Sequence, residues 1–403
     1  MAAAEVAPSK GDGEEMEGVA HLRLLRPVGP LSLGFVRDGE DVVLVARDRS
    51  ARWPTEVLRD GTVELDIEGR ITGGAVELVT DPEEKSRTLA LFRAKYGERQ
   101  FARWYSHPAR VLRVAPGGPQ PDDDPAERYH RWLAAEFDNV AEEYDHHITG
   151  NLVNRLLRDR SLAELRRAFS GAHHLIEVGC GSGMETLPLL EDGHEILCVD
   201  ISERMLGVVR AKARAAGLSE SLRTLRLAAS DLPRVRGATS VGTFDGAYST
   251  YGAMNCEEDL KAVPPALFDL LSPGAPFVAG VYNRWCLFEL VGYGVTGRWS
   301  RAFGRARSPI PVGSSRFCVD VYAYSVASFR RLFAPWFRPE RLEAVPAILP
   351  PSDLVGYAER FGRRWEALTG LDRSLARRWP FRALGDHFLL TFARRATPGG
   401  ARA

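Results

Sequence analysis

The feature that most restricts the fold of this chain is an apolar strand that leads directly into a glycine-rich loop. The segment from His174 to Gly183 reads HLIEVGCGSG, with further glycines at Gly179 and Gly181. Glycines at such a bend let a ligand approach the backbone, and the helix that follows begins with free N–H groups. The pattern predicts a strand, a tight loop and a helix start that together form a ligand-binding corner.

A second apolar strand supports this interpretation. Residues 196–200 read ILCVD and end in Asp200, which follows Gly179 by 21 residues. At that separation the carboxylate can lie beside the loop at the carboxyl edge of a parallel sheet, where it can accept both hydroxyls of an adenosine ribose. We therefore predict that a nucleoside-type ligand binds at this edge.

A nicotinamide dinucleotide site is the first alternative interpretation of the glycine loop. Dinucleotide loops carry glycine at the first, third and sixth positions, whereas here the sixth position is Met184 and glycine falls at the fifth. More than 170 residues also precede the loop, which is an unusual start for a dehydrogenase. The spacing therefore disfavours nicotinamide, and a purely structural glycine turn is the second alternative.

A segment rich in proline, glycine and aspartate separates two kinds of sequence. Residues 115–127 read APGGPQPDDDPAE, which we interpret as a linker because this composition resists regular structure. Before it, short β-rich runs with glycine turns predict a small barrel over residues 21–114, with a helix from Pro82 to Phe101. After it, helices alternate with apolar strands over residues 128–396, which predicts an α/β domain with a mostly parallel seven-stranded sheet.

The same alternation gives expected bounds for the elements of the second domain. Its first helices are expected at residues 126–144 and 152–169. Its strands are expected at residues 175–178, 196–200, 223–228, 244–248 and 276–282, with two late strands near 341–346 and 387–394. Residues 1–20 are expected to be a disordered tail.

Composition excludes several classes of protein. The chain has 53 basic and 53 acidic residues, so it has no net field toward nucleic acid or an anionic membrane. Residues 1–20 lack the features of a secretory signal, and no apolar run approaches the roughly 20 residues that span a bilayer. The five cysteines are odd in number and widely spaced, which fits neither a disulfide framework nor a zinc site. We expect a cytoplasmic protein without a metal, a membrane span or a nucleic-acid partner.

Successive motifs resemble those of class I S-adenosylmethionine-dependent methyltransferases. They are the run from Glu177 to Gly183, Asp200, the triplet at residues 230–232 and the pair at residues 244–245, all in the family's order and spacing. The resemblance covers about residues 137–394, with a lid-like FD and YD pattern at residues 137–145 and a closing strand GDHFLL at residues 385–390. It implies a Rossmann-like fold and S-adenosylmethionine as cofactor.

The resemblance also implies roles for individual residues. The three glycines would pack against the methionine and ribose parts of the cofactor, and Asp200 would bind the ribose hydroxyls. Met205 would lie against the adenine, whose amino group would donate to Asp231. Glu177 would bond to the loop or to the amino group of the cofactor. The expected cofactor-binding residues are Tyr144, Glu177, Gly179, Cys180, Gly181, Gly183, Asp200, Ile201, Met205, Asp231 and Leu232.

Methyl transfer from a sulfonium needs little acid or base chemistry, because the thioether that leaves is neutral. Alignment of the reactants supplies most of the catalysis, and a base matters only if the acceptor must first lose a proton. Residues near the predicted lid and sheet edge that could contact the acceptor are His146, His147, Tyr251, Tyr282 and Arg284. Of these, we expect His147, Tyr251 and Tyr282 to be catalytic, with a structural role as the alternative.

An insertion at residues 285–337 is expected to form a cap over the acceptor. It contains Arg298, Arg301, Arg305 and Arg307 among aromatic residues, a cluster that would suit an anionic acceptor or a nucleic-acid backbone. The zero net charge weighs against RNA, so we expect a small, lipid-like or anionic acceptor. The alternative is that the arginines form a solvated rim.

The first domain looks like the flavin- or deazaflavin-binding split barrels of the pyridoxamine phosphate oxidase-like and nitroreductase families. The similarity rests on the strand pattern over residues 22–114 and on the helix start from Asp81 to Glu84. The loop where those families hold the cofactor phosphate reads ARDRSARW at residues 46–53 and lacks their glycine. A flavin or deazaflavin oxidoreductase, a barrel that pairs the chain into a homodimer, and a non-catalytic S-adenosylmethionine-binding scaffold are therefore the alternatives that stay open.

Overall fold

The computed structural model describes residues 22–46, 53–105, 110–117, 124–238, 242–314 and 317–399. The chain divides into two compact units, Met1–Asn139 with Pro311–Val319 and Val140–Ile310 with Asp320–Ala403. The expected tail, the centre of the expected linker and residues 47–52 of the expected phosphate loop lie outside the described residues. The domain limits, the flavin site and the homodimer therefore stay predictions.

The first unit contains an antiparallel sheet of seven strands in the order β2-β1-β5-β6-β7-β4-β3. Its strands are β1 (Leu22–Arg26), β2 (Leu31–Ser32), β3 (Phe35–Asp38), β4 (Asp41–Val45), β5 (Thr62–Ile67), β6 (Arg70–Leu78) and β7 (Val111–Pro116). Alternate residues of β5 are buried, because successive side chains of a strand point to opposite faces. An antiparallel sheet fits the predicted small barrel, while the split-barrel resemblance stays a prediction.

The helices of the first unit differ from the expected ones in two places. They are α2 (Trp53–Asp60), α3 (Pro82–Tyr96), α4 (Glu98–Trp104) and α5 (Pro125–Asp138). The single helix expected from Pro82 to Phe101 is wrong, because the chain breaks at Gly97 with φ at 80°. Helix α2 was not predicted, since it is short and follows the presumed phosphate loop directly.

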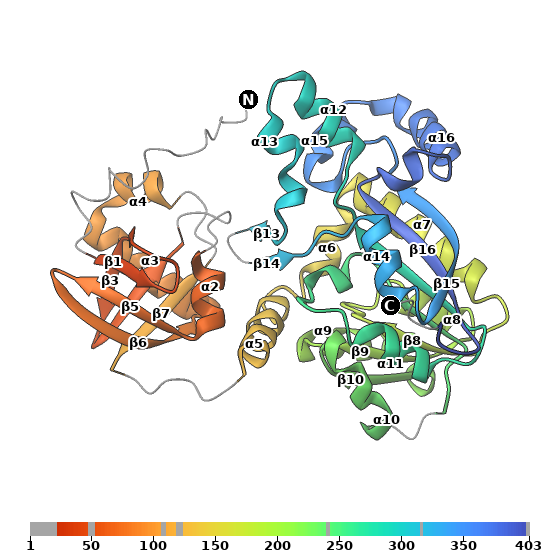
Figure 1. Cartoon of the computed structure of the whole chain (residues 1–403), viewed down its shortest axis with the longest axis horizontal. Coiled ribbons are helices and arrows are strands. Elements are labelled where there is room, and N and C mark those ends of the chain that lie inside the picture. Colours follow the sequence, from red (N-terminus) through yellow and green to blue (C-terminus); the bar gives the residue numbers. More distant parts are fainter. Residues whose placement is uncertain are drawn as a thin grey trace. The chain divides into compact units, whose positions relative to one another are not determined.

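The second unit is an α/β fold around a seven-stranded sheet, in the order β10-β9-β8-β11-β12-β16-β15 (Figure 1). Its strands are β8 (His174–Val178), β9 (Glu195–Asp200), β10 (Leu222–Arg226), β11 (Gly246–Ser249), β12 (Pro276–Tyr282), β15 (Phe337–Val345) and β16 (His387–Arg394). All seven expected strands form. The sheet is mixed, because neighbours from β10 to β12 pair in parallel whereas β16 runs antiparallel to both β12 and β15.

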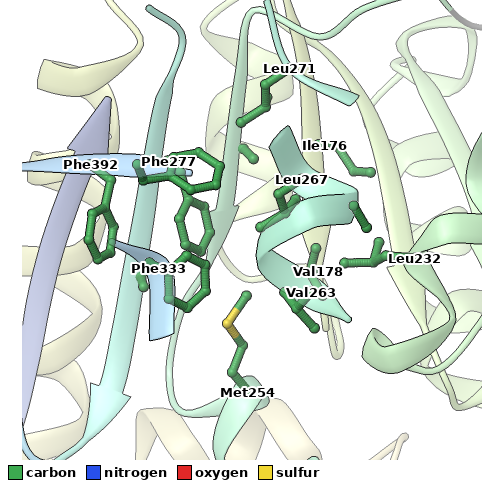
Figure 2. Close-up of a cluster of buried hydrophobic side chains, with 14 of the residues drawn as sticks. Ile176, Val178, Leu232, Met254, Val263, Leu267, Leu271, Phe277, Phe333 and Phe392 are labelled. Carbon is green, nitrogen blue, oxygen red and sulfur yellow. The ribbon is translucent and has the colours of Figure 1, made fainter. Parts of the chain in front are cut away.

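Apolar residues pack against both faces of this sheet, which explains why its strands β9, β12 and β16 are largely apolar rather than alternating. One face carries a core in which Ile176 and Phe277 pack with residues of α11 (Val263–Leu270) and α14 (Val326–Phe333). Figure 2 shows Phe277, Phe333 and Phe392 packed together in this core, and the ring centres of Phe277 and Phe333 lie 5.3 Å apart. The neighbouring strand residues Leu175 and Val278 point the other way, into a second core.

The second core lies under three helices that follow or precede the glycine loop. They are α7 (Leu152–Ala168), α8 (Thr186–Glu191) and α9 (Glu203–Ala215). Helix α9 begins after Ser202, whose hydroxyl accepts from the Met205 N–H at 3.1 Å. The helix expected over residues 126–144 ends instead at Asp138, and a separate helix α6 (Tyr144–Thr149) follows.

The cap insertion and the last helices complete the second unit. They are α12 (Leu287–Val295), α13 (Trp299–Ala302), α15 (Val355–Glu359) and α16 (Trp365–Leu375). The hairpin of β13 (Ile310–Ser314) and β14 (Phe317–Val321) interrupts the insertion, and its residues 311–319 belong to the first unit. In the part of the chain that the structure describes, no helix is long and apolar enough to cross a membrane. The carboxyl ends of β8, β9, β11 and β12 and the amino end of β16 lie at one edge of the sheet. The candidate site is built at this edge.

Candidate active site

The glycine loop after β8 requires glycine for two separate reasons. All three glycines have positive φ, at 74° for Gly179, 51° for Gly181 and 77° for Gly183. A Cβ on Gly179 would lie 2.4 Å from the Cβ of Ala253, and a Cβ on Gly183 would lie 2.9 Å from Val209, so the protein itself fills those spaces. A Cβ on Gly181 would meet only the ring of Tyr144, at 3.9 Å. Gly181 is thus the one of the three whose Cβ the protein would accommodate, in ordinary contact with the Tyr144 ring.

Asp200 joins the end of β9 to this loop. Its carboxylate accepts from the backbone N–H of Gly181 at 2.8 Å and from that of Ser202 at 2.9 Å. An ionised carboxylate is an acceptor for hydroxyl and N–H donors, which is the chemistry that a ribose needs. The predicted neighbourhood of Asp200 and the glycine loop is present in the structure.

Glu177 is buried beneath the loop rather than exposed on it. Its carboxyl accepts from Thr186, the first residue of α8, and from the Tyr248 hydroxyl at 2.9 Å, and the Cys198 thiol lies at 3.6 Å. Burial raises the pKa of Glu177 to about 8. The bond that we expected with the loop goes instead to Thr186, three residues beyond Gly183, and a contact with the cofactor's amino group stays a prediction.

Helix α6 is tethered across the glycine loop. Asp145 accepts from the Ser182 hydroxyl and from the Lys212 ammonium, and Lys212 also donates to the Ser182 carbonyl oxygen at 2.7 Å. Burial raises the pKa of the neighbouring Tyr144 to about 12, so its hydroxyl is protonated at neutral pH. The structure thus ties the segment of the expected lid to the glycine loop, and its role as a lid stays a prediction. His146 is exposed, and the side chain of His147 lies outside the described part of the chain.

The predicted adenine side of the site lies around the ends of β9 and β10. Met205 and Leu232 are buried, and Ile201 and Asp231 are half-buried. Asp231 lies 3.7 Å from Arg234. Cys180 lies within the loop with its thiol 3.6 Å from the Gly181 carbonyl oxygen, and burial raises the pKa of that thiol. Adenine contacts of these residues stay predictions.

Arg158 of α7 is a site residue that the sequence analysis missed. Its guanidinium lies 4.2 Å from the ring centre of Tyr251 and pairs with Glu185, which is buried beside the glycine loop. Among the described residues, neither Nε of Arg158 nor Oε1 of Glu185 has a hydrogen-bond partner. Helix α7 contains five arginines, and no local pattern distinguishes this one. The guanidinium and the carboxylate of this pair therefore each keep one atom at the site that no described residue uses in a hydrogen bond.

The rings of Tyr251, Tyr282 and His387 lie together at the edge of the sheet where β11 and β12 end and β16 begins. The ring of His387 lies 6.2 Å from that of Tyr251 and 5.2 Å from that of Tyr282. Burial raises the pKa of both tyrosines, so both remain protonated and can donate hydrogen bonds. His387 was missed as a site residue, although its segment was identified as the last strand. Catalytic roles for Tyr251 and Tyr282 stay predictions.

The four arginines of the cap do not form one surface cluster, which corrects the sequence interpretation. Arg298, Arg301 and Arg307 are exposed, whereas Arg305 is only 4% exposed. Arg305 donates to Glu289 in α12 and to Asp386 before β16, and its guanidinium lies 4.1 Å from the ring centre of Tyr282. Its charge is therefore neutralised inside the protein and does not face an anionic acceptor. Arg284 was also expected to contact the acceptor. In the structure its guanidinium donates to the Ala323 carbonyl oxygen.

Part of the chain is similar in sequence to known methyltransferases. A family model described as a methyltransferase domain matches residues 175–274. The tRNA 5-carboxymethoxyuridine methyltransferase of Escherichia coli is 26% identical over 156 residues, which are 36% of this chain and 56% of that protein. The demethylmenaquinone methyltransferase of Leptospira interrogans is 26% identical over 162 residues, which are 38% of this chain and 63% of that protein. The chain thus spans a little over half the length of these curated relatives.

Solved structures of low sequence identity are also similar in part. The 1,6-didemethyltoxoflavin-N1-methyltransferase of Burkholderia thailandensis, solved with S-adenosylhomocysteine, is 16% identical, with a TM-score of 0.42 over 70% of this chain and 95% of that one. The CcbJ methyltransferase of Streptomyces caelestis is 14% identical, with a TM-score of 0.43 over 65% of this chain and 98% of that one.

Proposed function

We propose that this chain, whose second unit carries a class I S-adenosylmethionine-dependent methyltransferase domain, transfers a methyl group from S-adenosylmethionine to a small-molecule acceptor. The observation that carries the proposal is the bond between Asp200 and the Gly181 N–H, which places an acidic strand end beside the glycine loop. Helix α6 is tethered to the same loop through Ser182 and to α9 through Lys212.

The residues around this loop fit the cofactor. The Asp200 carboxylate is the kind of acceptor that ribose hydroxyls need, and it bonds to Gly181, whose Cβ would fit beside Tyr144 in ordinary contact. Ile201, Met205, Asp231 and Leu232 supply the apolar and acidic surroundings that adenine needs. When bound, S-adenosylmethionine supplies an electrophilic methyl group on a sulfonium whose thioether leaves without a charge.

Arg158 and Glu185 fit the amino-acid end of the same molecule. The Arg158 guanidinium has an unused Nε–H, which can donate to a carboxylate, and Glu185 has an unused oxygen, which can accept from an ammonium group. Both side chains interact electrostatically with Tyr144 and Tyr251, and Tyr144 in turn interacts with Asp200. We assign this pair to the zwitterionic end of the cofactor, because a buried ion pair with unmet donors and acceptors suits a ligand with both charges.

A small acceptor suits the other side of the site. We place the acceptor beside the rings of Tyr251, Tyr282 and His387, which lie together, and the buried Arg305 anchors the cap insertion. Aromatic walls suit an apolar or ring-containing molecule. The curated relatives include enzymes whose names specify a tRNA and a quinone, so an RNA acceptor is the second candidate. The zero net charge of the chain favours the small molecule.

The proposal is tested by binding of S-adenosylhomocysteine, measured by calorimetry. Asp200→Asn should weaken binding at least about tenfold, because one lost charged hydrogen bond is worth about 1.5 to 3 kcal/mol. Asp245→Asn is a matched control, since Asp245 also accepts from two backbone N–H groups, those of His173 and His174, at the amino end of the sheet. Wild-type protein that ignores both S-adenosylmethionine and S-adenosylhomocysteine at millimolar concentration would disprove the proposal.

The acceptor class is tested by transfer of labelled methyl groups from S-adenosylmethionine into a cell extract that has been split into RNA and small-molecule fractions. We expect the label in a small molecule, and its identification gives the acceptor. Label in the RNA fraction would favour the second candidate. Donor binding without label in either fraction would favour a non-catalytic scaffold.

A further inference from the structure

His387 lies in a setting that differs from that of the other described histidines. It begins β16 and pairs with Tyr282 of β12 across the sheet edge that carries the site. Its Nδ1 lies 3.0 Å from Oδ2 of Asp386. The His387 side chain is 12% exposed and that of Asp386 is 1% exposed, so the carboxylate is buried behind the imidazole.

The surroundings of Asp386 decide where the imidazole proton lies. Burial alone would raise the pKa of Asp386, but Arg305 and His387 outweigh it and lower that pKa to about 2. Arg305 donates to the second carboxylate oxygen, Oδ1, at 2.6 Å. An ionised carboxylate can only accept hydrogen bonds, so Nδ1 of His387 must be the protonated nitrogen. In the neutral ring Nε2 then carries a lone pair.

This lone pair lies beside Gly252, the residue that follows Tyr251. In the described part of the chain, Nε2 makes no hydrogen bond, and a Cβ on Gly252 would lie 3.9 Å from it. The turn formed by Tyr251, Gly252 and Ala253 lies between His387 and the glycine loop, because Ala253 packs against Gly179. The charged groups nearest the two flanking rings are Arg158 over Tyr251 and Arg305 over Tyr282.

We infer that His387, oriented by Asp386, is the general base that takes a proton from the acceptor, and that the acceptor therefore presents an O–H or N–H group to the methyl donor. This inference rests on the proposed function. The Nε2 lone pair forms the new N–H bond, and the electron pair of the broken O–H or N–H bond stays on the acceptor atom. That atom bonds to the methyl carbon as the carbon–sulfur electron pair goes to sulfur, and the imidazolium later releases its proton to water.

The pairing with Asp386 suits this role. A carboxylate behind Nδ1 fixes the tautomer and stabilises the imidazolium that forms, as in other histidine–aspartate pairs. General bases contribute about 100-fold to 10,000-fold to rates. Tyr251 and Tyr282 keep their protons at neutral pH because burial raises the pKa of each, so His387 is the group among the three that can accept one.

The test compares His387→Gln and His387→Ala with the control variant His174→Gln. His174 also pairs with a carboxylate, that of Glu195 at 3.2 Å, but it lies exposed at the amino end of β8. We expect His387→Gln to bind S-adenosylhomocysteine like the wild type while turnover of labelled methyl groups into the extract falls about 100-fold or more. Imidazole added to His387→Ala should restore part of that turnover, which a merely structural role would not allow. His174→Gln should change neither quantity.

A second measurement uses the wild-type protein, so it does not depend on the folding of a variant. Nitrogen-15 NMR of histidine-labelled wild-type protein should show His387 protonated at Nδ1 and unprotonated at Nε2 in its neutral form. A proton on Nε2, or wild-type turnover by His387→Gln, overturns the role of His387 and leaves the methyltransferase proposal standing. Failure of the wild-type protein to bind S-adenosylhomocysteine overturns the proposed function itself, and with it this inference.

Discussion

Arg305 and Asp386 form a buried ion pair in which Nη2 lies 2.6 Å from Oδ1. The same guanidinium donates to Glu289 and to the backbone carbonyl oxygen of Asn283. One cation from the cap insertion thus holds a carboxylate from α12 and another from the start of β16. Because Asp386 also orients His387, this pair connects the fold of the cap to the chemistry of the site.

Arg305→Ala should destabilise the second unit by about 3 to 5 kcal/mol, because it leaves two buried carboxylates without their cation. The measurement is urea denaturation followed by circular dichroism. Arg301→Ala is the control, since Arg301 lies in the same insertion but is exposed, and surface substitutions usually change stability by less than about 0.5 kcal/mol. Equal stability of the two variants would show that the Arg305 pair has no structural importance.

Substitution of two glycines of the loop should separate folding from cofactor binding. Gly179→Ala should destabilise the protein by about 2 to 4 kcal/mol, since its Cβ would lie 2.4 Å from that of Ala253 and its φ is positive. Gly181→Ala meets only Tyr144 at 3.9 Å, so it should cost about 1 kcal/mol of stability yet weaken S-adenosylhomocysteine binding.

The contrast is checked by thermal unfolding and calorimetry on the same samples. The double substitution Gly179→Ala with Ala253→Gly should recover part of the lost stability, because it removes the atom that the new Cβ would meet. If Gly181→Ala bound S-adenosylhomocysteine as well as the wild type, the space beside Tyr144 would not be the ligand site.

Arg158→Met, combined with Glu185→Gln so that no buried charge is left alone, should weaken binding of S-adenosylhomocysteine by about 10-fold to 100-fold. Methylthioadenosine lacks the amino-acid group, so its affinity should not change. Both affinities are measured by calorimetry. Arg155→Met is the control, because the exposed Arg155 only donates to the Thr149 carbonyl oxygen. An equal loss for both ligands would place Arg158 outside the amino-acid end of the site.

The sequence predicted the strands of the second unit well because burial on both faces leaves a strong signal. Residues 196–199 and 276–282 are apolar runs, and the structure forms β9 and β12 at those positions. The glycine loop and Asp200 could be identified from the sequence equally well, since a positive φ and the end of a strand are local properties. The limits of the helices were harder to predict from the sequence. Helix α3 ends because Gly97 has a positive φ, although the residues around it are good helix formers.

The charged residues of the site could not be sorted from sequence alone. Arg305 looks like its exposed neighbours Arg301 and Arg307, and only its contact with Asp386, 81 residues further along the chain, makes it buried. Arg158 and His387 acquire their roles in the same way, through partners that the fold brings together. The adjacent pair Asp386 and His387 at the start of an expected strand was the one local signal that could have been used.

The buried carboxyl of Glu177 gives the last prediction, which concerns stability and pH. Its pKa, raised by burial to about 8, lies above the ordinary value of 4.5. Between those two values the folded protein holds a proton that the unfolded chain has lost, so this group's contribution to stability is complete below about pH 4.5 and disappears as pH rises through about 8. In Glu177→Gln the amide can still accept from Thr186 and Tyr248 but does not titrate.

The free energy of unfolding of wild type minus that of Glu177→Gln should therefore fall by about 2 to 5 kcal/mol between pH 5 and pH 8.5. Urea denaturation at intervals across that range measures it, and groups that titrate equally in both proteins cancel in the difference. Glu191→Gln, at the exposed end of α8, should give a flat difference. A flat difference for Glu177→Gln as well would mean that the Glu177 carboxyl is ionised in the folded protein, and the pocket formed by Thr186, Tyr248 and Cys198 would then have to stabilise a buried charge.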